Sequence, residues 1–151
     1  MAITQAGCTS AKAEFLNGIH LSTDTYKIAL YTSSATLDAS TTAYTTTGEV
    51  VGTGYTAGGA TLSGFNVTTS GTTAILDWTT DPSWANATIT ARGALIYNAS
   101  KSNKALCVLD FTSDKTSTDG TFAVTLPTPD ALAHHSEQKK PLPSGNGRLK
   151  N

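Results

Sequence analysis

Few residues of this chain have side chains suited to catalysis, and their positions do not suggest a catalytic site. A triad of the serine-protease type needs a base that can reach an activated hydroxyl. Of the three histidines, His20, His134 and His135, two lie near the C-terminus. No Gly-x-Ser-x-Gly motif is present, and Cys107 has hydrophobic neighbours on both sides, as expected of a buried thiol. We therefore expect a protein that is not an enzyme.

Two further patterns could in principle bind an ion or a phosphate. Asp110, Asp114 and Asp119 are close in sequence, and clustered carboxylates can hold Ca²⁺. Their spacing is not that of an EF-hand, and an ordinary hairpin turn is the alternative explanation. The glycine-rich stretch 52–59 lacks the Gly-Lys-Ser/Thr ending of a phosphate-binding loop, so it is expected to be a flexible connection between strands. We expect no cofactor and no resident metal.

Four aromatic residues leave a carbohydrate-binding function open. Tyr44, Tyr55, Trp78 and Trp84 could form an exposed platform on a β-sandwich, as in an adhesin-like module. The competing interpretation is that both tryptophans anchor the hydrophobic core. Exposure of Trp78 and Trp84 distinguishes the two.

The composition favours a protein that works by packing. Only 14% of the 151 residues are charged, against roughly 25% in an ordinary soluble domain, and Thr, Ser, Gly and Ala take the place of the missing charges. Short side chains lose little entropy when a surface is buried against a partner. A net charge of −1 gives no basis for nucleic-acid binding, and no apolar run approaches the ~20 residues of a membrane span. With no secretory signal, Cys8 and Cys107 are expected to be reduced and buried.

One short helix is expected near the N-terminus, over about residues 9–18. Thr9 or Ser10 could cap it with a hydroxyl, and Gly18 suits its end because glycine readily adopts a left-handed conformation. One face of this helix is apolar and is formed by Ala11, Phe15 and Ile19, with Leu16 beside them.

From Asp24 onward the hydrophobic period changes to two, which predicts strands. Residues 32–47 have little periodicity and are expected to form an extended loop, and Asp81–Trp84 a turn. Asp119-Gly120 is typical of a hairpin turn. The pattern predicts an all-β domain over residues 1–126, of the β-sandwich or jelly-roll type. Its strands are expected at about 26–31, 49–51, 60–68, 72–79, 87–91, 93–98, 104–111 and 121–126.

Residues 127–151 form a second, proline-punctuated segment that contains four of the five prolines. Such a sequence does not form a central strand or a helix. It is either an unstructured tail or an extended C-terminal arm that orders against a neighbouring subunit. In the second case Leu142 and Leu149 are the expected anchors, and Arg148 and Lys150 the charged contacts.

Three blocks stand out within residues 1–126. They are Ala6–Ser10 followed by Asn17–His20 and Asp24–Ser33; Gly48–Gly59; and Arg92–Asn98 followed by Val108–Phe111 and Asp114–Lys115. Each block alone is a common β-loop pattern. As a set, they resemble a family of small virion structural proteins of tailed bacteriophages.

The resemblance implies a protein of the virion, synthesised in the host cytoplasm, with the major capsid protein or other virion proteins as partners. A head decoration or cement protein, forming a homo-oligomer on the outer capsid surface, is the leading expectation. A tail, neck or fibre component is the alternative. The residues expected at protein interfaces are Phe15, Leu16, Leu142, Arg148, Leu149 and Lys150.

Overall fold

A computed structural model describes residues 2–125 and 142–143 of the chain. The fold is all-β with one short helix, as the sequence predicts, and its sheets are antiparallel. Its elements in chain order are β1 (Ala6–Gly7), α1 (Thr9–Leu16), β2 (Tyr26–Tyr31), β3 (Ala60–Thr61), β4 (Phe65–Ser70), β5 (Thr73–Trp78), β6 (Ser83–Asn98), β7 (Lys104–Thr125) and β8 (Leu142–Pro143).

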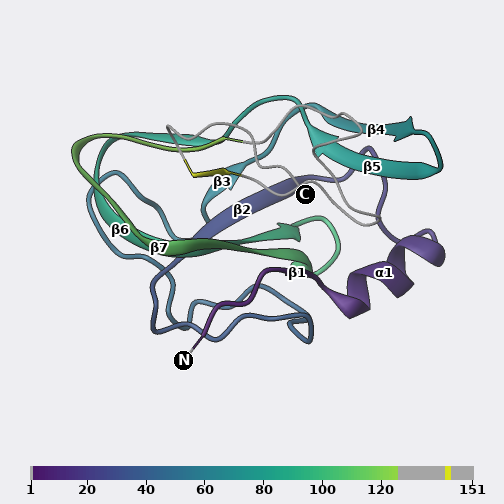
Figure 1. The fold of residues 1–151 in the computed structure, drawn as a ribbon, viewed down its shortest axis with the longest axis horizontal. Coiled ribbons are helices and arrows are strands. Elements are labelled where there is room, and N and C mark those ends of the chain that lie inside the picture. The colour runs from purple at the N-terminus through teal and green to yellow at the C-terminus, as the bar shows by residue number, and fades with distance from the viewer. Residues whose placement is uncertain (1, 126–141, 144–151) are drawn as a thin grey trace.

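Most strands belong to one sheet in the order β1-β7-β6-β2-β3, and β8 pairs with the end of β7. Strands β4 and β5 form a separate two-stranded sheet. In Figure 1, α1 and the β4–β5 pair lie at the same end of the molecule. No helix in the described part of the chain is long and apolar enough to cross a membrane.

The long β6–β7 hairpin dominates the fold, and here four predicted strands proved to be two. At Arg92, where the sequence predicts a gap between two strands, the pairing of β6 with β7 is interrupted, but β6 itself continues. Ala91 pairs with Lys115 and Gly93 with Asp110, so four residues of β7 lie opposite one residue of β6. Such bulges bend and twist a strand pair, and in Figure 1 both strands curve back to form a second layer.

One predicted turn was wrong, and a second is shorter than predicted. Asp119 and Gly120 lie inside β7, where Asp119 has a φ of 52° and the pairing with β6 shifts register. An Asp-Gly pair therefore makes a bulge here rather than a hairpin turn. Asp81 and Pro82 precede β6, but Ser83 and Trp84 already belong to it.

Elsewhere the strand predictions are confirmed in part. β2 has the predicted bounds, and β5 is one residue shorter at each end. The predicted strand 60–68 is divided into β3 and β4. Residues 49–51 form no strand, since only a single bridge joins Glu49 to Tyr31.

The helix is shorter than expected and is capped differently. Cys8 precedes its first turn in an extended conformation, and no side chain caps it, so the prediction of a Thr9 or Ser10 cap was wrong. Its end matches the prediction: Gly18 has a φ of 71°, its amide donates to Phe15 O, and the Ile19 amide donates to Glu14 O. This is a Schellman motif, and it ends the helix at Leu16.

The core lies where β2, β6 and β7 meet. The largest fully buried side chains include Tyr26, Tyr31, Ile28, Leu95 and Leu106. The lack of a side chain at Gly93 lets β6 approach β7 and Ile3 closely. A Cβ at this position would collide with the Leu109 carbonyl oxygen and lie 2.9 Å from Ile3 Cγ2.

The proposed division at residue 126 stays a prediction. Of the C-terminal segment, the structure describes the backbone of β8 alone, in which Leu142 pairs with Thr125. Arg148, Leu149 and Lys150 lie outside the described residues.

Candidate interaction surface

An apolar groove of about 390 Å³ separates α1 from the β4–β5 pair. Its walls include Phe15 and Leu16 from the helix and Val67 and Leu76 from the strands, with Lys12 the one charged residue among the described lining residues. Leu16 is 91% exposed and Val67 59% exposed. Large apolar side chains gathered around a hollow are typical of a surface that binds another molecule.

The helix presents its two interface candidates differently. Phe15 is half-buried, packs against the core and lies with its ring centroid 4.8 Å from that of His20. Leu16 follows it by one residue, about 100° around the helix, and therefore projects away from the core. The predicted pair thus comes together at one groove, and their role in an interface stays a prediction.

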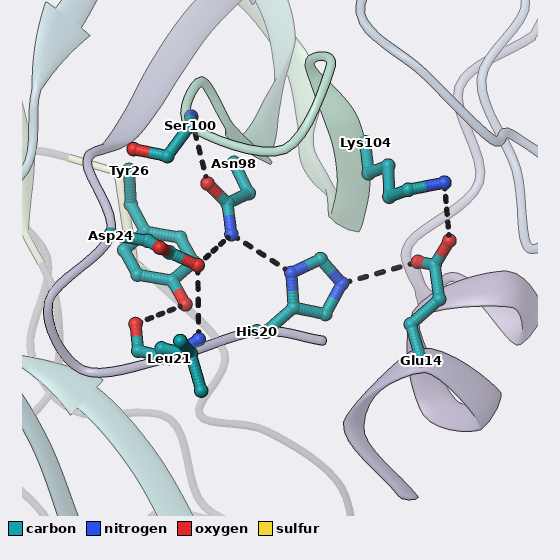
Figure 2. A network of polar contacts seen from close by, with 8 residues as sticks. All are labelled: Glu14, His20, Leu21, Asp24, Tyr26, Asn98, Ser100 and Lys104. Carbon is teal, nitrogen blue, oxygen red and sulfur yellow. Dashed lines mark hydrogen bonds and ion pairs between the residues drawn. The ribbon is translucent and has the colours of Figure 1, made fainter. Parts of the chain in front are cut away.

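A polar network fixes the helix against the sheet (Figure 2). His20, whose side chain is fully buried, places Nε2 3.1 Å from Glu14 Oε1 on α1. The other carboxylate oxygen of Glu14 lies 3.2 Å from Lys104 Nζ. On the far side of the ring, Asn98 Nδ2 lies 3.0 Å from His20 Nδ1. One buried imidazole therefore connects the helix to the end of β6.

The hydrogen bonds of Asn98 determine which tautomer His20 adopts. Asn98 Oδ1 accepts from the Ser100 amide at 2.9 Å, and Nδ2 donates to Asp24 Oδ2 at 2.8 Å. This orientation leaves the second Nδ2 hydrogen for His20 Nδ1, which accepts it, so Nε2 is the ring nitrogen that donates to Glu14 Oε1. Both ring nitrogens are occupied by protein groups, which suits a structural role better than proton transfer to a ligand.

Asp24 is the acidic member of this network. Burial alone would raise the pKa of its carboxyl, but hydrogen bonds from Asn98 and the Leu21 amide, together with Lys101, outweigh it and leave the pKa below its usual value. Lys101 Nζ lies 3.3 Å from Asp24 Oδ1. The ionised carboxylate of Asp24 therefore holds the loop before β2 to the turn after β6.

A second buried carboxylate, Glu49, organises the glycine-rich stretch. Its oxygens accept hydrogen bonds from Tyr44 Oη at 2.7 Å, Tyr55 Oη at 2.6 Å and the Gly58 amide at 2.8 Å. Burial, and then these bonds to Glu49, raise the pKa of both tyrosines. The stretch 52–59 connects β2 to β3, and Tyr55 and Gly58 within it are hydrogen-bonded to Glu49. Its flexibility stays a prediction. The sequence offered no clue to Glu49, which stands between a glycine and a valine.

The remaining candidates for chemistry are dispersed or buried. Cys8 and Cys107 are free and buried, as predicted, and burial raises the pKa of Cys8 to about 11. Asp110 binds Arg92 Nε at 3.2 Å and the Thr112 amide at 2.8 Å. Within residues 2–125, no group of three His, Cys, Asp or Glu residues is placed to hold a metal ion. The calcium hypothesis for Asp110, Asp114 and Asp119 therefore has no described site.

The aromatic platform proposed for carbohydrate binding does not form. Trp78 is 5% exposed and Trp84 7% exposed. In the core, Trp78 forms a T-shaped ring contact with Tyr26, and Trp84 forms one with Phe122. Both tryptophans are core anchors, so the carbohydrate hypothesis loses the residues on which it depended.

Comparison of the chain with protein-family models, with curated proteins and with solved structures gives no match in any of the three.

Proposed function

We propose that this protein is a structural component of a tailed-bacteriophage virion, a head decoration protein that binds the outer surface of the major capsid protein. The observation that carries the proposal is the groove between α1 and the β4–β5 pair, where Leu16 and Val67 are exposed. The sequence blocks that resemble small virion proteins supply the identity of the partner.

The chemistry of the groove defines the partner surface. Since its described lining is apolar apart from Lys12, the complementary part of the capsid protein is an apolar segment. Each Å² of apolar surface buried contributes about 25 cal/mol, offset in part by the cost of association. A capsid presents many identical sites, so oligomeric copies would gain from avidity even if each contact were weak.

The side chains that could react with a ligand have protein partners instead. His20, Glu49 and Asp24 are all held in hydrogen-bonded networks. The His20 network ties α1, which forms one wall of the groove, to the end of β6. Rigidity of this kind lowers the entropy lost on docking.

Mass spectrometry of purified virions tests the proposal. We expect the protein in the particle at hundreds of copies, together with binding of the purified protein to capsids that lack it. A dozen copies or fewer would assign it to the neck, tail or fibre instead. Absence from virions, combined with failure to bind capsids, would contradict the proposal altogether.

A further inference from the structure

One edge of β5 runs along the groove between α1 and the β4–β5 pair. Three successive residues of β5, Ala74, Ile75 and Leu76, line this groove. Because successive side chains of a strand point to opposite faces, three lining residues in a row mean that the groove follows the edge of the strand rather than one face. In Figure 1, β5 lies between β4 and α1. We call this side of the strand the groove-side edge of β5.

The groove-side edge has no strand partner in the described part of the chain. Among those residues, β4 is the one strand that pairs with β5, and the two form a separate sheet. The isolated bridges between described residues join other segments. A strand edge of this kind carries a row of backbone donors and acceptors and is a template for the addition of another strand.

The register of the β4–β5 pair shows which backbone groups point into the groove. Just beyond the two strands and in the same register, the Thr79 amide donates to Gly64 O at 3.1 Å. Bonded and non-bonded positions alternate along an antiparallel pair, so the odd-numbered residues of β5 bond to β4. The amide and carbonyl groups of Ala74 and Leu76 therefore point away from β4, toward the groove.

Apolar side chains stand beside these backbone groups. Leu16 on α1 is 91% exposed, and Val67, which pairs with Leu76, is 59% exposed. In recognition by strand addition, backbone hydrogen bonds supply affinity, and contacts with alternate side chains of the added strand supply specificity. Lys12 is the one charged residue among the described lining residues, and its positive charge favours an acidic residue over a basic one in the partner.

We infer that the groove binds an extended apolar segment of the capsid protein as an added strand, paired with the groove-side edge of β5. The inference rests on the proposed function and specifies how the partner is recognised. Two residues of the segment would form hydrogen-bonded pairs with Ala74 and Leu76. The segment therefore has apolar residues at alternate positions and no proline at either of the two paired positions, since proline has no amide to donate.

Removing one groove-side amide tests the mode of binding. Ala74→Pro deletes an N–H group that points away from β4, so the β4–β5 hydrogen bonds are retained. Ala74→Val, the matched control, adds a side chain of similar size and keeps the amide. With capsids that lack this protein as the probe, Ala74→Pro should reduce co-sedimentation at least tenfold, and Ala74→Val should bind within twofold of the wild-type protein.

The outcomes separate the inference from the proposed function. Equal binding by the proline and valine variants, with the wild-type protein bound, would overturn strand addition and leave the proposed function standing. Failure of the wild-type protein to bind capsids would overturn both.

Amide hydrogen exchange in the unmodified protein gives a test that does not depend on the folding of a variant. In the capsid-bound protein, the amides of Ala74 and Leu76 should exchange at least tenfold more slowly than in the free protein. The Ile75 amide, which bonds to β4, should be slow in both and is the internal control. Unchanged exchange at Ala74 and Leu76 on binding would overturn the inference. Slow exchange of both amides in the free protein, whether monomeric or dimeric, would show that the edge is already occupied and would overturn it too.

Discussion

The two halves of the β6–β7 hairpin use the same pair of strands in different ways. In the half nearest the hairpin turn, residues 93–98 of β6 are all buried and lie between β2 and β7. In the far half, residues 83–91 alternate between exposed and buried positions. The first half is central in the sheet and covered on both faces, whereas the second has one face in solvent. Stability should therefore be concentrated in the near half, and the far half should tolerate change on its outer face.

The largest effect is expected from a cavity in the near half. Leu95 is completely buried, so Leu95→Ala should lower the free energy of unfolding by about 2–5 kcal/mol. Denaturant titration measures the change. A loss under ~1 kcal/mol would show that this half is less tightly packed than its burial implies.

The polar network at the end of the same half should come next. Asn98→Ala removes the donor to Asp24 and His20 and leaves buried polar groups unsatisfied, which should cost about 1–3 kcal/mol. Ser100→Ala, which removes only an exposed acceptor of the Thr25 amide, is the control and should cost less. Equal losses in the two variants would contradict a special role for Asn98.

Asp24 should make the network sensitive to acid. Because its pKa is lowered in the folded state, its contribution is complete above the unfolded value of about 4 and is lost as the pH falls through the folded value. The stability difference between the wild-type protein and Asp24→Asn should therefore be larger at pH 7 than at pH 2. Urea titrations at the two pH values measure it, and an unchanged difference would refute the assignment.

The smallest effect is expected on the outer face of the far half. Thr90 is exposed, and its hydroxyl lies 3.0 Å from that of Thr116 across the strand pair. Thr90→Ala should change the free energy of unfolding by no more than about 0.5 kcal/mol. A loss approaching that of Leu95→Ala would erase the distinction between the two halves.

Some strands could be predicted from the sequence, whereas the continuity of the β6–β7 hairpin could not. Alternating residue types predicted β2 and the end of β7. At the end of β7 burial alternates as well, whereas β2 is buried at nearly every position. The continuity of β6 and β7 could not be predicted, since Gly93 and Asp119-Gly120 resemble strand breaks. Their real roles, close packing against Leu109 and a bulge, depend on residues distant in sequence.

The candidate surface was predicted only on its helical side. Phe15 and Leu16 followed from helical periodicity, but their partners Val67 and Leu76 come from a hairpin whose position depends on tertiary packing. The buried network of His20 was missed for the same reason, since Asn98 lies 78 residues away from it. The partners of Glu49 lie within nine residues of it, but they belong to an irregular loop in which no periodicity indicates which side chains meet.

Binding of groove variants to capsids tests the central claim most directly. Leu16→Asp and Val67→Asp place a carboxylate in the groove and should reduce co-sedimentation with capsids at least tenfold while leaving unfolding curves unchanged. Val51→Asp is the matched control, because Val51 is 96% exposed but does not line the groove, and it should bind as the wild-type protein does. Equal binding by all three variants would contradict a role for this groove in packing against the capsid.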